Sequence, residues 1–282
     1  MPDTMQAPVT PVEVSRSGKG PIERAEDLLV TEEPLEIRLD HGPVDDRRED
    51  RITVTMRTPG DDRELAIGFL LSEGILSGTD DIIRVEHCQQ VKPEEMGNVV
   101  RVSLKPEVQV DTARWQRNFY VSSSCGVCGK GSLEAVRNLC PVKQLHPPTI
   151  TRAVLLELPR RMREAQVVFQ HTGGIHAAAL FDPAGKLLLL HEDVGRHNAV
   201  DKVIGAAQLA DLPLVDRLLL VSGRAGFELV QKCVMAGIPA MAAVGAPSSL
   251  AVQLAKDNLL LLIGFLRDDR FNVYSGDPAL IA

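Results

Sequence analysis

The chain of 282 residues lacks any apolar stretch of membrane-spanning length. Even the leucine-rich run over residues 259–265 is far shorter than the about 20 apolar residues that a helix needs to cross a bilayer. The first 20 residues hold no cationic segment followed by an apolar run, so we expect neither a secretory signal nor a transit peptide. These absences predict a cytoplasmic protein with no membrane partner.

Cysteine and positive charge are also scarce. Five cysteines, an odd number at irregular spacings, do not resemble a disulfide framework and favour a reducing compartment. The 31 lysines and arginines are outnumbered by 38 aspartates and glutamates, which gives a formal net charge of −7. A negatively charged chain is poorly suited to broad binding of nucleic acid, so we expect no such partner.

Two of the cysteines stand three residues apart in a glycine-rich segment. Residues 122–131 read SSSCGVCGKG and contain Cys125 and Cys128. An expected helix N-terminus and the charge of Lys130 favour the thiolate, which is the reactive form of cysteine. The glycines allow a bulky partner to approach the backbone closely. The segment therefore predicts sulfur chemistry at Cys125 and Cys128.

A structural zinc half-site is the alternative interpretation of C-x-x-C, but a closed site needs two more ligands. Cys88, Cys140 and Cys233 are scattered singly, and we expect them in or near the core. His171 and His176 are separated by two glycines and do not share a helical face. We therefore predict no metal site.

Composition divides the chain into three regions. Residues 1–20 are polar and proline-rich and are expected to form a disordered tail. Residues 21–148 are predicted to form a smaller α+β domain that ends in the C-x-x-C loop and its helix, because strand-like alternation over residues 52–56 and 99–104 surrounds a capped helix near residue 65. The consecutive prolines 147 and 148 mark the boundary, and residues 149–282 form the larger domain.

The larger domain alternates between helix and strand patterns. After a helix that starts at Thr151 and a hairpin over residues 177–190, helices are predicted over residues 197–209, 226–236 and 248–257, and strands over residues 217–222, 240–244 and 259–265. Such αβ repeats imply a largely parallel sheet flanked by helices. The fold class is therefore α/β.

Polar residues collect where these strands give way to helices, over residues 191–198, 222–226 and 246–249. This is the edge of an open α/β sheet at which ligands usually bind. Arg224 is suited to hold a phosphate, although Asp193 and Ser248 could simply cap helices and Arg224 could pair with an acid. Together the clusters predict an anionic ligand.

Residues 265–274 place arginines and aromatic rings between two strands. Arg267 and Arg270 are suited to grip phosphates, and the aromatic rings to stack on a base or pterin. The alternative is a solvated hairpin with ion pairs from Asp268 and Asp269.

In combination these segments resemble the FdhD family, and the resemblance covers most of residues 30–276. It rests on SSSCGVCG (122–129), HTGGIHAA (171–178), EDVGRHNA (192–199) with Asp201 and Lys202, SGRA (222–225), AGIP (236–239) and RFNVY (270–274). Members are sulfur carriers required for formate dehydrogenase activity. The resemblance implies a sulfurtransferase with a cysteine persulfide intermediate, whose catalytic residues would be Cys125, the persulfide carrier, and Cys128, a second thiol.

The resemblance also implies partners and a substrate. A cysteine desulfurase would supply the sulfur, and the carrier would pass it to the molybdenum cofactor, in its bis(pterin guanine dinucleotide) form, before insertion into the formate dehydrogenase catalytic subunit. The cofactor is a bound substrate, with none held permanently, and a homodimer is usual in the family. The candidate cofactor-binding residues are Phe265, Leu266, Arg267, Asp268, Asp269, Arg270, His171, Arg196, His197, Asn198, Ser222 and Arg224.

The family's second domain is similar to the cytidine deaminase fold, which implies a three-layer domain with a mixed sheet. Zinc deaminases need H-x-E and P-C-x-x-C at successive helix starts, but here those positions hold RHN (196–198) and SGRAG (222–226). Zinc hydrolysis is therefore disfavoured, and reuse of the nucleoside pocket is expected.

Two other functions compete with this one. A dithiol oxidoreductase would form a reversible disulfide between Cys125 and Cys128 and would have no nucleotide site. A non-catalytic chaperone for the cofactor or apoenzyme would still function after the substitution Cys125→Ala.

Overall fold

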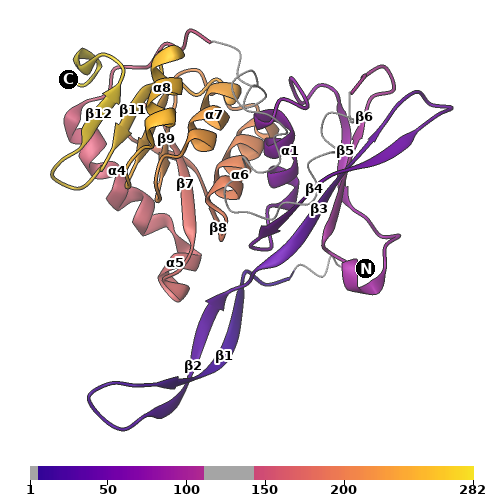
Figure 1. The fold of residues 1–282 in the computed structure, drawn as a ribbon, viewed down its shortest axis with the longest axis horizontal. Helices are drawn as coiled ribbons and strands as arrows, with labels where there is room; N and C mark the ends of the chain where they lie inside the picture. The colour runs from indigo at the N-terminus through magenta and orange to yellow at the C-terminus, as the bar shows by residue number, and fades with distance from the viewer. Residues whose placement is uncertain (1–5, 111–142) are drawn as a thin grey trace.

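The computed structural model describes residues 6–110 and 143–282 (Figure 1). They form two β-sheets with the helices that cover them, and a two-stranded arm. The first sheet has the order β4-β3-β6-β5. Its strands are β3 (Glu33–His41), β4 (Arg48–Arg57), β5 (Ile82–His87) and β6 (Val99–Leu104), and a short 3-10 turn spans Pro93–Glu95. β3 and β6 are parallel, whereas the β3–β4 and β5–β6 pairs are antiparallel.

One face of this sheet is covered by α1 (Asp62–Ser72). Alternate residues of β3 are fully buried, namely Leu35, Ile37 and Leu39, and they belong to the same apolar core as Leu65 and Leu70 of the helix. The period-two pattern of the strand thus meets the apolar side of the helix. The helix and strands predicted for this region are confirmed.

The second sheet has six strands in the order β12-β11-β10-β9-β7-β8. They are β7 (His176–Phe181), β8 (Leu187–Asp193), β9 (Leu218–Val221), β10 (Ala240–Ala243), β11 (Leu261–Gly264) and β12 (Asn272–Ser275). Only β9, β10 and β11 are mutually parallel, and the other neighbours pair antiparallel. The sheet is therefore mixed rather than largely parallel as expected, and its parallel part is limited to three adjacent strands, because the hairpin of β7 and β8 and the last strand β12 pair antiparallel.

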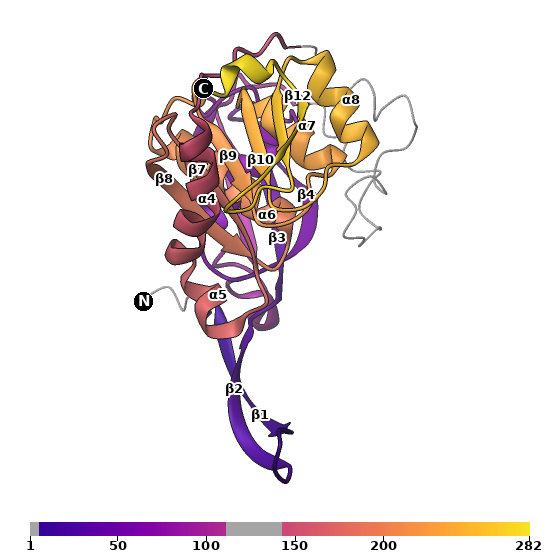
Figure 2. The same ribbon diagram turned by 90° about the vertical axis from the view of Figure 1, so that its left-hand side faces the viewer.

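Helices cover both faces of the second sheet. On one face lie α6 (Arg196–Leu209), α7 (Phe227–Ala236) and α8 (Ser249–Asp257), and on the other lie α4 (Arg152–Ala165) and the short α5 (Val167–Thr172) (Figure 2). The apolar residues of β9 are buried on both faces of the sheet. Leu219 and Val221 belong to the core under α6 and α7. Leu218 and Leu220 belong to the core under α4. The predicted α/β class, with three layers around a mixed sheet, is confirmed.

The two sheets are joined through their helices. α1 packs against α6 and α7, so that the molecule is layered as sheet, helix, helices, sheet and helix (Figure 1). The backbones of α1 and α6 are in direct contact at glycines. A Cβ added to Gly205 would lie 1.9 Å from the carbonyl oxygen of Glu64, a separation that no side chain allows.

The N-terminal region differs from its prediction. Within the segment that we expected to be a disordered tail, Val9–Arg16 forms β1, which pairs antiparallel with β2 (Glu23–Val30). The two strands project as an arm from the rest of the molecule (Figures 1 and 2). The prediction rested on the low hydrophobicity of residues 1–20 taken alone. The strand that pairs with β1 lies beyond residue 20 and so was not part of that segment.

Two of the single cysteines lie in the core as expected: Cys88 is 5% exposed and Cys233 is fully buried. Cys125, Cys128, Lys130 and Cys140 lie outside the described residues. Within residues 6–110 and 143–282, no helix combines the length and apolar character that crossing a bilayer requires.

Candidate functional site

Strand direction brings the predicted polar clusters to one edge of the six-stranded sheet. The carboxyl ends of β9, β10 and β11 share this edge because these strands are parallel. β7 runs antiparallel to β9, and β8 runs antiparallel to β7, so the start of β7 and the end of β8 lie there as well. We call this the carboxyl edge. The expected convergence of residues 191–198, 222–226 and 246–249 is confirmed.

The loops at the carboxyl edge are joined by backbone hydrogen bonds. The N–H of Gly245 donates to the carbonyl of Gly223 over 2.9 Å, and the N–H of Phe265 donates to the carbonyl of Gly245 over 3.0 Å. A Cβ on Gly245 would lie 2.9 Å from Cα of Arg224, and a Cβ on Gly264 would lie 2.8 Å from Cδ of Pro247. Glycine is therefore required for this close approach, and the loops that follow β9, β10 and β11 form one continuous surface.

Two arginines on this surface, the exposed Arg224 and the half-buried Arg196, are unpaired within the described part of the chain. Among the described residues, the guanidinium groups of Arg196 and Arg224 have no hydrogen-bond or ion-pair partner. The alternative that Arg224 pairs with an acid therefore finds no support in the described residues. The helices α6, α7 and α8 also begin at this edge, where helix N-termini carry partial positive charge. The arrangement is suited to an anion.

The segment after β11 forms a tight turn. The N–H of Arg267 donates to the carbonyl of Arg270 over 2.8 Å, and its guanidinium donates to the carbonyl of Val244 over 2.5 Å. Phe265 has a left-handed φ of 53° and remains 42% exposed, whereas Leu266 is fully buried in the core. Leu266 therefore anchors the turn. Arg270, Asp268 and Asp269 are exposed, and Arg270 lies 3.6 Å from a carboxylate oxygen of Asp269, as in the solvated-hairpin alternative.

The hydroxyl groups of Ser222 and Ser248 accept hydrogen bonds from backbone N–H groups at this edge. Ser222 Oγ accepts a hydrogen bond from the N–H of Ala177 over 2.9 Å, which ties the end of β9 to the start of β7. Ser248 Oγ accepts from the N–H of Ala251 over 3.3 Å and caps α8, which was the structural alternative for this residue.

Asn198 lies in the interface between the two sheets. Its amide donates to the carbonyl of Met56 over 2.8 Å and to Asp193 Oδ1 over 3.1 Å, and its oxygen accepts from Thr55 Oγ1 over 3.1 Å. The side chain is 7% exposed. Asn198 thus fixes the start of α6 against β4, and the structure does not bring it to the surface with Arg224.

Asp193 is the centre of the same interface. Its carboxylate is fully buried and accepts from the backbone N–H groups of Gly195 and Thr58, and Lys202 Nζ lies 2.9 Å away. Burial raises the pKa of Asp193, and the contact with Lys202 opposes that effect. Lys202 also donates to the carbonyl of Thr58 over 2.9 Å. The turn between β4 and α1 is thereby locked beside the carboxyl edge.

His171 is exposed at the end of α5, apart from these groups. Glu192 holds α5 in place, because its carboxylate accepts from the N–H groups of Val168 and Phe169 over 2.8 and 2.9 Å. α5 in turn packs against β2 near the base of the arm (Figure 1).

The sequence alone did not identify Glu228 as a site residue. Glu228 stands in the first turn of α7, and its Oε2 lies 2.8 Å from His197 Nε2. His176 lies nearby, with its ring 3.5 Å from where a Cβ on Gly223 would be. Burial lowers the pKa of His176, and the charges of Arg196 and His197 lower it further. An acid in a first helical turn is common, so no sequence signal marked Glu228.

These groups do not form a metal centre. Across the described part of the chain, no three histidine, cysteine, aspartate or glutamate side chains are grouped closely enough to hold a metal ion.

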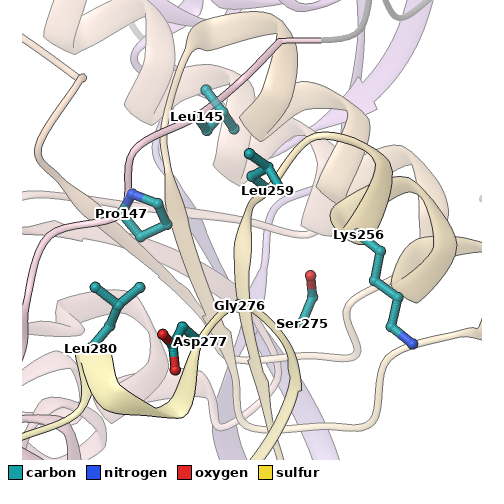
Figure 3. A pocket seen from close by; sticks show the side chains of 8 residues that line it. All are labelled: Leu145, Pro147, Lys256, Leu259, Ser275, Gly276, Asp277 and Leu280. Carbon is teal, nitrogen blue, oxygen red and sulfur yellow. The ribbon is translucent and has the colours of Figure 1, made fainter.

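A pocket of about 400 Å³ lies at the opposite edge of the sheet and contains none of the predicted site residues (Figure 3). It lies between the end of α8 and the segment after β12. Its lining is mostly apolar and comprises Leu145, Pro147, Lys256, Leu259, Ser275, Gly276, Asp277 and Leu280.

Comparisons with known proteins agree with this architecture. A crystal structure from Desulfotalea psychrophila, described as that of a formate dehydrogenase accessory protein, matches with a TM-score of 0.72. The match covers 97% of this chain and 99% of that one at 23% sequence identity, and it establishes the fold.

Sequence relatives are closer. The "Sulfur carrier protein FdhD" of Streptomyces coelicolor is 51% identical over 268 residues, which cover 93% of this chain and 92% of the relative. The protein of the same name from Mycobacterium tuberculosis is 50% identical over 256 residues, which cover 88% and 90%. Residues 30–281 match the sequence model of the FdhD/NarQ family. The chain therefore belongs to the FdhD/NarQ family.

Proposed function

We propose that this protein is a sulfur carrier for formate dehydrogenase that acts as a sulfurtransferase. It accepts a persulfide sulfur from a cysteine desulfurase and transfers it to the bis(pterin guanine dinucleotide) form of the molybdenum cofactor before the cofactor is inserted. The observation that carries the proposal is the 51% identity, over nearly the whole chain, to a relative named as a sulfur carrier protein. The carboxyl edge supports it, because it offers unpaired cations to a substrate rich in phosphate.

Cys125 is proposed as the carrier of the sulfur. Its thiolate attacks the outer sulfur of the desulfurase persulfide, so that a new S–S bond forms as the old one breaks and the desulfurase thiolate leaves. Neither sulfur needs an external oxidant in this exchange. Cys128 is proposed as the second thiol, which takes up or releases the sulfur, and Lys130, two residues further along the sequence, favours both thiolates.

The carboxyl edge is proposed as the cradle of the cofactor. We propose that Arg196, Arg224 and Arg270 bind the diphosphates and that the exposed ring of Phe265 stacks on a base. The loops are stabilised by Arg267 and Ser222, whose side chains hydrogen-bond to backbone groups, and by Leu266, which is buried in the core. Asp268 and Asp269 remain candidate acceptors for donors of the guanine or pterin. His197 completes the proposed residues at this edge, and His171 is proposed as a further contact from the end of α5, apart from the edge.

The other proposed partners are the cysteine desulfurase and the catalytic subunit of formate dehydrogenase, in the cytoplasm. We also propose a homodimer. The arm supports this proposal, because an isolated two-stranded sheet is only marginally stable in water and this one exposes Ile22 and Leu29. A partner surface would stabilise it.

Mass spectrometry of the peptide that contains Cys125 and Cys128 tests the carrier function. After incubation with a cysteine desulfurase and free cysteine, we expect one added sulfur on Cys125, and none after Cys125→Ala. Cys88→Ala is the matched control, because this buried thiol is not expected to take part. A Cys125–Cys128 disulfide without added sulfur would favour the dithiol oxidoreductase. Full formate dehydrogenase activity in cells that carry only the Cys125→Ala protein would favour the chaperone.

A further inference from the structure

His197 and Glu228 form a contact between two helix starts at the carboxyl edge. His197 is the second residue of α6, and Glu228 is the second residue of α7. Nε2 of the imidazole lies 2.8 Å from Oε2 of the carboxylate, and the two side chains are only 19% and 12% exposed. The contact is therefore largely shielded from water, which would otherwise weaken it.

The two nitrogens of His197 have different surroundings. Nε2 is buried and lies 2.8 Å from Glu228 Oε2 at ion-pair distance, without the angles of a hydrogen bond. Nδ1 has no hydrogen-bond partner among residues 6–110 and 143–282. When Nε2 is held by a carboxylate, the other ring nitrogen becomes the one that is presented to a ligand. Glu228 thus determines the orientation of the ring.

The backbone at His197 is held in place independently of Glu228. The start of α6 is held by the bonds of Asp193 to Gly195 and Asn198, and by those of Asn198 to β4. His176 on β7 lies close enough to be influenced by the charge of His197, and by those of Arg196 on α6 and Asp193 on β8. Replacement of Glu228 therefore removes a contact of the imidazole while the start of α6 stays in place.

We propose that Glu228 is a positioning residue that orients the imidazole of His197 toward a diphosphate of the guanine nucleotide at the carboxyl edge. This inference rests on the proposed nucleotide site. An imidazolium, in which both ring nitrogens are donors, can meet the carboxylate with Nε2 and a phosphate with Nδ1. Glu228 itself does not touch the ligand, because its free oxygen is buried.

The test measures GDP affinity by calorimetry between about pH 5 and pH 8, the range in which histidine changes charge. Glu228→Gln keeps the shape and an acceptor but removes the charge. We expect GDP to bind this variant roughly tenfold more weakly than wild type at the acidic end, where a histidine ring carries two donors, and the difference to shrink toward the alkaline end. His197→Asn is expected to bind weakly with little dependence on pH, since its side chain does not titrate in this range.

Asp50→Asn is the matched control, because Asp50 Oδ2 lies 2.9 Å from His41 Nε2 in the first sheet, away from the carboxyl edge. This variant should follow the wild-type profile. Equal GDP affinities and equal pH profiles for wild type, Glu228→Gln and His197→Asn would overturn the inference and leave the proposed nucleotide site intact. No GDP binding by wild type at any pH would overturn both.

Discussion

Gly68 of α1 lies directly against the backbone of Asp201 in α6. A Cβ added to Gly68 would be 1.8 Å from the carbonyl oxygen of Asp201, and Gly205 makes the reciprocal contact with α1. Two glycines thus let two helices approach until their backbones touch. Since α6 also begins at the carboxyl edge, this contact fixes the first sheet relative to the candidate site.

Gly68→Ala is expected to destabilise the protein by about 3 kcal/mol or more, since backbone on both sides leaves no room for a methyl group. The direction of this stability change is informative, because replacing glycine by alanine in a helix interior normally increases stability. Urea unfolding measures the effect. Gly78→Ala is the control, as no atom lies within 4 Å of its added Cβ. An unchanged midpoint for Gly68→Ala would contradict the close contact of α1 and α6.

Lys232 provides a second test of this interface. Its ammonium lies 2.9 Å from Asp201 and 3.0 Å from Glu73, and it is nearly inaccessible to solvent. Burial alone would lower the pKa of Lys232, but the two carboxylates outweigh burial and raise it, so the lysine stays charged. Lys232→Met leaves Asp201 buried without its cation and is expected to cost about 3–5 kcal/mol.

The measurement for Lys232→Met is again urea unfolding, and Lys256→Met serves as the control because Lys256 is exposed. The double variant Lys232→Met with Asp201→Asn should recover part of the loss, since it removes the unpaired charge. If Lys232→Met alone were as stable as wild type, the buried ion pair would not contribute as described.

The sequence predicted those elements whose pattern is local. The apolar run of β9 indicated a strand covered on both faces, and the structure places Leu218 under α4 and Leu219 under α6 and α7. The convergence of loops at the carboxyl edge followed from strand order alone. The arm could not be predicted in this way, because β1 is recognisable as a strand only through its pairing with β2.

The details of the site depend on contacts between segments far apart in the chain. Asn198 was predicted to face a ligand, but its amide is held by Met56 and Thr55, which no local pattern connects with α6. Glu228 was missed for the same reason, since its significance comes from His197 on another helix. Sequence patterns identified the edge but not which side chains remain free on it.

His176 predicts a pH dependence of stability. Burial lowers its pKa below the ordinary 6.5, so the unfolded chain binds this proton more readily than the folded chain does. The contribution of His176 to stability is therefore complete above pH 6.5, declines as the pH falls through 6.5, and becomes constant below the folded-state value. Thermal unfolding at a series of pH values should show a smaller acid loss for His176→Asn than for wild type. Equal acid losses would show that the imidazole is not shielded.

The arginines of the carboxyl edge give the most direct test of the candidate site. Arg224 has no acidic partner among the described residues, so its charge is available to a ligand. Arg224→Ala and Arg270→Ala are each expected to weaken GDP binding roughly fivefold at low salt, with a smaller effect at high salt because these exposed charges are screened.

Arg160→Ala is the matched control for these two variants, since Arg160 is an exposed arginine of α4 that pairs with Glu157 and Glu164. It should bind GDP as wild type does. If all three variants lost affinity equally, general electrostatic attraction would account for binding, and the carboxyl edge would not be the site. If Arg224→Ala and Arg270→Ala alone lost affinity, the phosphates must lie between the loops that follow β9 and β11, where the backbone already brings the two segments together through Gly245.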